Sequence, residues 1–457
     1  MIEAQNQALK ETTAASFPKG LHNAFLFSGF NALSFQIVLS SPMVLYAKKL
    51  GASATVLGII AGMMPLLVIF QIPAANHIHR VGFKRFVYAG WGTRVLFIFA
   101  MALVPLTHRF LDPQTRLALM LTLLFCFNLS RGISSCAWLP WITILVPASL
   151  RGKYLSLDAA TQNSCSFVTF LVSAACLAGE PGGWQFAILF AFSAVMGAIS
   201  LTFLKRIPDA EMPEDVSGSK TKMPWLEMIR HPPFERLLWA VFGYSVAYGG
   251  MTAFTVAFLR TEGGMAEGTI LLVTAISFLG GLSSLWLLGS RLDRLGSKPV
   301  LTFCFAAWVA VLVGWICLSG RVVGMDLPLL AALQFLMGLL AALTQMSNTR
   351  LAMAVIPVMG RNHFFAIYSV VNNVTLGIAP VAWGLLIDAV GMRAPVWLGL
   401  SWNRFTIFFA ATALAYAFTL VLARRLHEPE AASLEELLRE LLIQSPQRFW
   451  VRFWPRA

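Results

Sequence analysis

Two arginines lie inside long apolar segments of this 457-residue sequence. Arg131 falls in the apolar run 116–146 and Arg94 in the run 87–107. A guanidinium presents a planar fork of donors that suits a carboxylate, so we expect Arg131 to contact an anionic or carboxylate-bearing solute. In the alternative interpretation, Arg131 or Arg94 pairs with Asp158 and with backbone carbonyls, and so stabilises packing.

Carboxylates are nearly absent from the apolar segments. Asp158 lies about one turn into the run 154–178, and Asp388 lies near the end of the run 363–390. Proton-coupled carriers commonly use a carboxylate that exchanges its proton inside the membrane. Asp158 and Arg94 are therefore candidates for a coupling role.

Motifs for covalent, metal or nucleotide chemistry are missing from the sequence. It contains no Ser-His-acid set, no His–Cys metal spacing and no phosphate-binding loop. The six cysteines fall inside apolar runs without paired spacing, as expected of small core residues. The sequence thus predicts no enzyme, no metal and no cofactor.

Composition indicates that lipid surrounds most of the chain. Hydrophobic residues make up 58% of the sequence and charged residues 12%, and the mean hydropathy is +0.72. Apolar runs of about 20 residues recur, each long enough to cross about 30 Å of hydrocarbon. Because no water satisfies backbone groups there, the runs must be helices. The predicted fold class is an all-α membrane protein.

Twelve membrane-spanning helices are predicted. Their expected bounds are 21–47, 55–75, 87–107, 116–146, 154–178, 184–205, 237–259, 268–290, 299–320, 328–355, 363–390 and 404–425. These form an N-terminal six-helix bundle, 21–205, and a C-terminal six-helix bundle, 237–425. A 1–20 N-tail, a polar linker over 206–236 and an amphipathic, aromatic tail over 426–457 complete the chain.

Charge distribution predicts the orientation. With both termini in the cytoplasm, the inner side carries 23 Lys and Arg residues and the outer loops carry eight. We therefore expect a bacterial-type inner membrane protein with cytoplasmic N- and C-termini. Arg350, near the cytoplasmic end of its helix, is expected to extend its charge to the membrane surface. The net charge of +13 reflects this topology and attraction to anionic lipid, with no nucleic-acid partner.

An internal repeat relates the two halves. The loop from His79 to Lys84 resembles the loop from Asp293 to Lys298, 214 residues later. A shift of 210 residues similarly relates the loops that follow the fourth and tenth helices. One six-helix unit is therefore repeated in parallel, a known plan of secondary transporters.

These loops resemble the signature Gly-x-x-x-Asp-Arg-x-Gly-Arg-Arg of the major facilitator superfamily, and the resemblance covers roughly residues 20–425. The second copy fits well, whereas the first has Ala75 in place of glycine and His79 in place of aspartate. The resemblance implies a cytoplasmic gate, in which Asp293 approaches the start of the fifth helix. The predicted gating residues are His79, Arg80, Gly82, Lys84, Gly289, Asp293, Arg294, Gly296 and Lys298.

The same resemblance implies that the first, fourth, seventh and tenth helices line a central cavity. The candidate substrate-binding residues on them are Asn31, Gln36, Arg131, Trp138, Tyr244, Ser245, Tyr248, Gln345 and Asn348. Each of these side chains could equally serve helix packing.

The predicted function is transport of a small organic solute by alternating access, secondary active or facilitative, with an anion favoured. Two alternatives stay open: a translocator of lipids, amphiphiles or drugs, and a transporter-like sensor or assembly factor that moves nothing. The expected partners are a small-molecule substrate and membrane lipid, and we expect a monomer.

Overall fold

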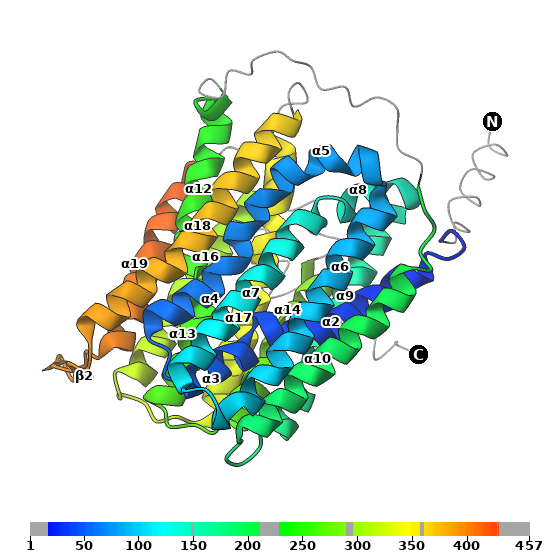
Figure 1. The fold of residues 1–457 in the computed structure, drawn as a ribbon. Helices are drawn as coiled ribbons and strands as arrows, with labels where there is room; N and C mark the ends of the chain where they lie inside the picture. Colours follow the sequence, from blue (N-terminus) through cyan, green and yellow to red (C-terminus); the bar gives the residue numbers. More distant parts are fainter. Residues whose placement is uncertain are drawn as a thin grey trace, which may run out of the picture. The chain divides into compact units, whose positions relative to one another are not determined.

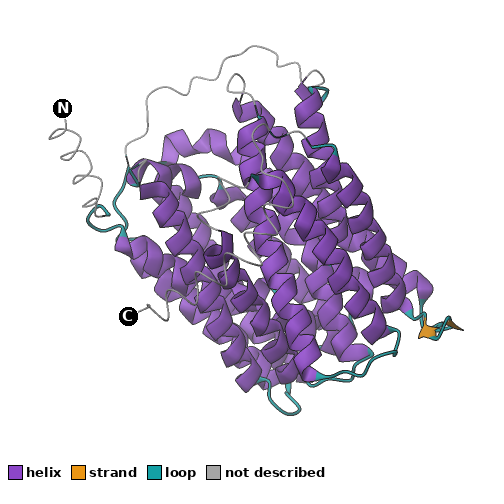
Figure 2. Cartoon of the chain, turned by 180° about the vertical axis from the view of Figure 1, so that it is seen from behind, coloured by secondary structure: helices purple, strands orange, loops and turns teal. Residues whose placement is uncertain are grey.

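The computed structural model describes residues 17–147, 150–210, 228–288, 296–356, 361–426 and 428. Nearly all of this part of the chain is helical, apart from one short β-hairpin (Figures 1 and 2). The N-terminal half contains α2 (His22–Leu39), α3 (Ser41–Lys49), α4 (Ala54–Leu67), η1 (Val68–Phe70), α5 (Gln71–Val81), α6 (Phe83–Leu103), η2 (Val104–Arg109), α7 (Pro113–Ser135), α8 (Trp138–Leu145), α9 (Arg151–Cys176) and α10 (Gly183–Leu204). The C-terminal half contains α12 (Pro232–Tyr248), α13 (Met251–Thr261), α14 (Glu267–Leu288), α16 (Ser297–Ser319), α17 (Leu327–Val355), α18 (Arg361–Val390), β1 (Val396–Trp397), β2 (Leu400–Ser401) and α19 (Arg404–Arg424).

Helices long and apolar enough to cross a membrane match the predicted spans. Within the described residues there are 11 such segments. The twelfth expected span is α9, a helix of 26 residues that includes Asp158, Gln162 and Asn163 and is less apolar than the others. The all-α membrane fold is therefore confirmed, and its helix ends lie close to the predicted ones.

Several spans consist of two helical pieces. The first span breaks between α2 and α3, where Pro42 stands near the start of the second piece. The seventh breaks between α12 and α13, where Gly250 adopts a left-handed conformation with φ of 81°. These two breaks fall at corresponding places in the repeat, a feature that the apolar pattern of the sequence did not predict.

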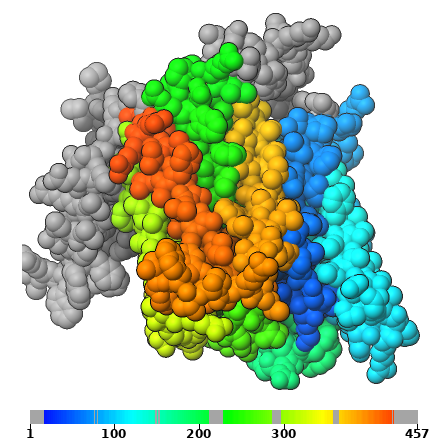
Figure 3. Space-filling model, turned by 90° about the vertical axis from the view of Figure 1, so that its left-hand side faces the viewer, coloured from blue at the N-terminus to red at the C-terminus, as the bar shows by residue number. Residues whose placement is uncertain are grey.

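The chain divides into two compact units. Unit 1 comprises Met1–Leu39, Leu67–Thr169 and Pro181–Ser219, and unit 2 comprises Ser40–Leu66, Phe170–Glu180 and Lys220–Ala457. In unit 1, α10 packs against α2 and α6, and α6 packs against α7. In unit 2, α14 packs against α17 and α16 against α19, and Figure 3 shows α12 (green) beside α18 and α19 (orange to red).

The units differ from the predicted halves at two segments. Unit 2 includes 40–66, which contains α3 and α4, and 170–180, which contains the end of α9, although both come from the N-terminal half of the sequence. The bundle bounds of 21–205 and 237–425 stay a prediction. The N-tail before residue 17 and the tail beyond Glu428 lie outside the described residues.

Candidate substrate and gating sites

Arg94 lies near the middle of α6 and is 3% exposed. Its guanidinium carbon is 4.6 Å from the ring centroid of Trp91 and 5.0 Å from that of Phe127. Both rings offer a cation–π contact, which compensates part of the lost hydration. The Nε and Nη1 atoms of Arg94 nevertheless have no hydrogen-bond partner among the described residues. Arg94 is thus a buried cation with unused donors.

Arg131 on α7 is half-buried and near enough to Arg94 for the two charges to repel each other. Among the described residues, no carboxylate offsets either charge. Asp158 instead accepts a hydrogen bond from Gln162 Nε2 at 2.7 Å and interacts with the Ser28 hydroxyl. The alternative in which Asp158 neutralises an arginine therefore finds no support in unit 1.

The other candidates in unit 1 divide between half-exposed and packed side chains. Asn31 and Gln36 on α2 are half-buried. Trp138 is half-buried as well, but its ring centroid lies 4.9 Å from that of Phe27 and 6.0 Å from that of Trp141. Trp138 therefore belongs to an aromatic cluster, which favours packing as its role.

In unit 2, the tyrosine candidates belong to a buried aromatic cluster. The rings of Tyr244 and Tyr248 stack at 5.4 Å, as the spacing of four residues on one helix allows. Tyr248 also contacts Trp308, which stacks on Tyr416 at 5.1 Å. Neither the Trp308 Nε1 nor the Tyr416 hydroxyl has a hydrogen-bond partner among the described residues.

Three polar candidates in unit 2 have different surroundings. The hydroxyl of Ser245 donates to the amide oxygen of Asn372, with 3.0 Å between Oγ and Oδ1. Asn348 is 4% exposed, and Gln345, on the same helix, is exposed. The side chain of Ser245 therefore links α12 to α18. Gln345 and Asn348 lie in different surroundings, one exposed and one buried.

The predicted gating loops are described in part. Gly82 and Gly296 precede α6 and α16 with φ of 86° and 82°, a region that favours glycine, so the repeat places the same turn in both units. Arg80 is exposed and Lys84 half-buried. The side chain of His79 and all of Gly289, Asp293 and Arg294 lie outside the described residues, so their gating roles stay predictions.

Glu428 holds the start of α16, a contact that no sequence pattern predicted. Its carboxylate accepts hydrogen bonds from the backbone N–H groups of Ser297 and Lys298 at 2.7–3.0 Å. Arg350 of α17 forms an ion pair with it at 2.6 Å, and the Glu428 side chain is 4% exposed. A carboxylate at a helix N-terminus meets both unpaired donors and a favourable dipole. The expectation that Arg350 extends to the membrane surface stays a prediction; its guanidinium pairs with Glu428, which lies beyond the end of α19.

Unit 1 has an apolar cluster at the corresponding place. Pro208 is the fourth residue beyond α10, as Glu428 is beyond α19, and its carbonyl accepts a hydrogen bond from Trp141 Nε1 at 3.1 Å. Trp141 is fully buried, together with Phe83 and Ile207. Just beyond the last helix of each unit, the chain is therefore held by hydrophobic packing in unit 1 and by an ion pair in unit 2.

At the other end of unit 2, Asp388 caps α4. Its carboxylate accepts hydrogen bonds from the backbone N–H of Ala54 at 3.0 Å, the N–H of Thr55 at 2.8 Å and the hydroxyl of Thr55 at 2.6 Å. The capping group thus comes from a residue more than 300 positions away in the sequence. Since α4 precedes the linker and α18 follows it, this contact joins the two sequence halves within unit 2.

Glycines let α4 and α18 approach backbone to backbone. A Cβ atom on Gly58 would lie 2.2 Å from the carbonyl oxygen of Pro380, and one on Gly62 would lie 2.2 Å from that of Gly377. Both distances are too short for any other residue without movement of a helix. We call this contact, together with the Asp388 cap, the α4–α18 closure.

Sequence reasoning missed both Glu428 and the role of Asp388. Asp388 is visible in the sequence as an acid near the end of an apolar helix, but nothing there identifies Thr55 as its partner. Glu428 stands at the start of a tail whose pattern predicts only a membrane anchor.

These features define a polytopic helical membrane protein with a repeated architecture. Its sequence matches the model of the Major Facilitator Superfamily over residues 24–281 and 242–455. The chain belongs to this superfamily, whose members are transporters. The predicted family is thereby confirmed, and the protein is a membrane transporter.

Solved structures share this fold at low sequence identity. The D-xylose–proton symporter has a TM-score of 0.70 and 12% identity, covering 90% of this chain and 99% of that chain. A mutant of the nucleoside transporter NupG has a TM-score of 0.68 and 11% identity, covering 90% and 100%. The inward-open xylose transporter XylE from E. coli has a TM-score of 0.66 and 15% identity, covering 91% and 98%. No curated protein sequence matches the chain. Identities this low establish the fold and leave the solute open.

Proposed function

We propose that this protein moves a small organic anion across a bacterial-type inner membrane by alternating access. The observation that carries the proposal is the pair Arg94 and Arg131, a buried and a half-buried cation without a carboxylate partner among the described residues. A charge deep in hydrocarbon is unfavourable by several kcal/mol unless water, dipoles or a counter-ion compensate it. A bound anion would relieve both the desolvation and the mutual repulsion.

The roles of the two arginines differ in this proposal. Arg131, which is half-buried, is the residue that contacts the anion. Arg94 is held behind it by the Trp91 and Phe127 rings and adds a positive field. Asp158 remains a candidate for proton coupling, since it lies on another helix of the same unit.

Alternating access requires contacts between the sequence halves that open and close. The α4–α18 closure is suited to this role, because it joins α4 of the first half to α18 of the second through hydrogen bonds and tight glycine packing. In the proposal it opens in one conformation, and the predicted gating roles of the loops near Gly82 and Gly296 belong to the same cycle. Cytoplasmic termini, halves bounded by 21–205 and 237–425, and a monomeric state complete the proposal.

Replacing Arg131 by Gln tests the proposal in proteoliposomes. The change keeps donors but removes the charge and the bidentate fork, so uptake of an anionic substrate should fall about tenfold or more. Arg109→Gln is the matched control, because Arg109 is exposed at the end of the same unit and should leave uptake unchanged. A neutral substrate carried equally well by the wild type and Arg131→Gln would refute the anion assignment.

Two other functions predict different outcomes. If the substrate is a lipid, amphiphile or drug, lysolipids should compete with uptake of the small anion. If the protein is a sensor or assembly factor, purified protein should bind its ligand and move none of it across a sealed membrane. Flux measured on purified protein thus separates the sensor or assembly factor from the two transporters, and competition by lysolipids separates the two transporters from each other.

A further inference from the structure

The β-hairpin between α18 and α19 exposes a compact apolar surface. Strand β1 pairs with β2 in antiparallel fashion, and the hairpin tip consists of Val396, Trp397 and Leu398, which are 75%, 64% and 76% exposed. The preceding Met392 is 91% exposed. Figure 3 shows this segment (orange) on the surface of unit 2. A patch of this kind at the end of a membrane-spanning bundle lies where headgroups meet acyl chains, and tryptophan favours that boundary.

Hydrogen bonds hold the hairpin in a defined position. The N–H of Ser401 donates to the carbonyl of Gly320 at 3.0 Å, and Asn403 Nδ2 donates to the carbonyl of Ser319 at 2.6 Å. Within the hairpin, Trp402 Nε1 donates to the carbonyl of Trp397 at 3.2 Å. The apolar tip is therefore presented by the end of α16 and does not depend on the hairpin alone.

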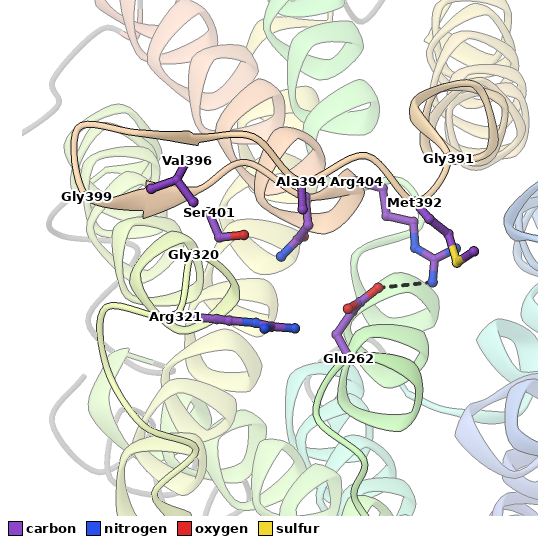
Figure 4. A pocket seen from close by; sticks show the side chains of 11 residues that line it. Glu262, Gly320, Arg321, Gly391, Met392, Ala394, Val396, Gly399, Ser401 and Arg404 are labelled. Carbon is purple, nitrogen blue, oxygen red and sulfur yellow. Dashed lines mark hydrogen bonds and ion pairs between the residues drawn. The ribbon is translucent and has the colours of Figure 1, made fainter.

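A positively charged cavity of about 510 Å³ lies behind the hairpin (Figure 4). The guanidinium of Arg321 points into it, and Arg404 lies on its opposite side in an ion pair with Glu262 at 3.1 Å. Arg321 makes no ion pair among the described residues, so two arginines face one carboxylate. Ser401, from the hairpin itself, adds a hydroxyl to the lining. These groups are donors suited to a phosphate.

Backbone strain marks Arg321 in particular. Its φ of 61° lies in the left-handed region, which a long side chain adopts at an energetic disadvantage. Glycine would adopt the same φ without this disadvantage. An arginine at a position that disfavours it is consistent with a binding role for its guanidinium.

A second cavity, of about 290 Å³, adjoins the first and has several apolar residues in its lining. It shares Glu262 and Arg321 with the first cavity and adds Phe258, Leu318 and Val322 to its lining. Val322 is 54% exposed. Charged groups thus lie between an apolar hairpin and an apolar hollow, the arrangement that an amphiphile with an anionic headgroup needs.

We infer that unit 2 binds an anionic membrane phospholipid at this place. Arg321 and Arg404 bind the headgroup phosphate, while Val396, Trp397 and Leu398 insert among the acyl chains. The site is distinct from the substrate site proposed in unit 1 and does not depend on the transported solute. Its role is to attach the end of α18 and the start of α19 to the lipid surface.

The test compares lipids in nanodiscs. Purified full-length protein is placed in phosphatidylcholine discs with and without phosphatidylglycerol, and retained lipid is measured by native mass spectrometry. Wild type should retain phosphatidylglycerol preferentially. Arg321→Gln should reduce that preference about fivefold, the effect of losing a hydrogen bond to the headgroup phosphate inside the cavity. Arg393→Gln removes an exposed arginine that does not line the cavity, so it should retain the wild-type preference.

Two further variants separate the lipid contacts from general stability. Arg321→Gly should raise the melting temperature by relieving the left-handed backbone, yet lose the phosphatidylglycerol preference. Leu398→Ser should lower the total lipid retained without changing the choice between the two lipids. Full retention of the preference in both Arg321 variants would overturn the inference.

Free glycerol 3-phosphate distinguishes a lipid from a soluble phosphate. It carries a glycerol-linked phosphate without acyl chains, as a monoester where the lipid has a diester, so it should not displace phosphatidylglycerol. Displacement at comparable concentration would show a site for a soluble organic phosphate and overturn the lipid assignment. Because the readouts are lipid retention and melting temperature, failure here would leave the transport proposal untouched.

Discussion

Asp388→Asn is the change that most directly tests the α4–α18 closure. The substitution keeps the size of the side chain and one carbonyl oxygen, but it removes the negative charge that faces the N-terminus of α4. In the structure, three donors share this carboxylate, at 2.6–3.0 Å. The asparagine oxygen can accept from one backbone N–H, but its amide nitrogen cannot accept from the other, and only the Thr55 hydroxyl can turn to accept from that nitrogen.

The expected magnitude follows from these contacts. Hydrogen bonds to a charged group contribute about 1.5–3 kcal/mol when buried, and a charge at a helix N-terminus contributes about 0.3–1 kcal/mol. Asp388 is exposed, so solvent screens most of this energy. We therefore expect Asp388→Asn to disfavour the closed contact by about 1 kcal/mol, which changes the closed-to-open ratio by about fivefold.

Pulsed electron paramagnetic resonance measures this ratio. Spin labels at Ile59 on α4 and Met392 beyond α18, both exposed, report the distance between the two elements in nanodiscs. The variant should show more of the long distance than the wild type. Asp326→Asn is the matched control, because Asp326 stands at the N-cap of α17 without a side-chain capping bond. Identical distance distributions in wild type and Asp388→Asn would refute the role of Asp388 in the closure.

Three other predictions concern Glu428, the packing glycines and the topology. Glu428→Gln should destabilise unit 2 by about 2 kcal/mol, because it leaves the charge of Arg350 without its ion pair. Glu262→Gln, which breaks the more exposed pair with Arg404, should lower the melting temperature less, and equal melting temperatures of the two variants would contradict this. Gly58→Ala should lower the melting temperature, because its Cβ would meet the carbonyl of Pro380, whereas Gly92→Ala meets nothing within 4 Å and should raise the melting temperature slightly. A higher melting temperature in both variants would disprove tight packing at Gly58. Tags after Ala457 and within 209–220 should resist external reagents in intact cells, and tags beside Gly324 should react; external labelling of the linker would reverse the orientation.

Helix number and approximate bounds were predictable because hydrocarbon imposes one strong rule on every span. A run of apolar residues must be helical, so composition alone located α16 and α17 to within a few residues. The breaks were harder to predict. Gly250 interrupts the seventh span through its backbone conformation, and a single glycine in an apolar run gives no unique signal of that.

The candidate sites show where sequence reasoning stops. Arg94 and Arg131 were identifiable because a charge is conspicuous in an apolar segment. The proximity of the two arginines could not be predicted, because it depends on how α6 packs against α7. Asp388 and Thr55 illustrate the same limit, because a cap formed across more than 300 residues leaves no local pattern in the sequence.

Equivalent places in the two units are held by an ion pair in one and by hydrophobic packing in the other, so salt should affect the two contacts in opposite directions. Salt screens charge pairs, so rising ionic strength loosens the cluster of Glu428 and Arg350 where water reaches it. Salting-out salts strengthen apolar contacts, so the packing of Trp141 beside Pro208 tightens as the ionic strength that screens its counterpart rises. A duplicated architecture thus carries two sensitivities to salt, and a single measured salt dependence will be the sum of two opposed responses.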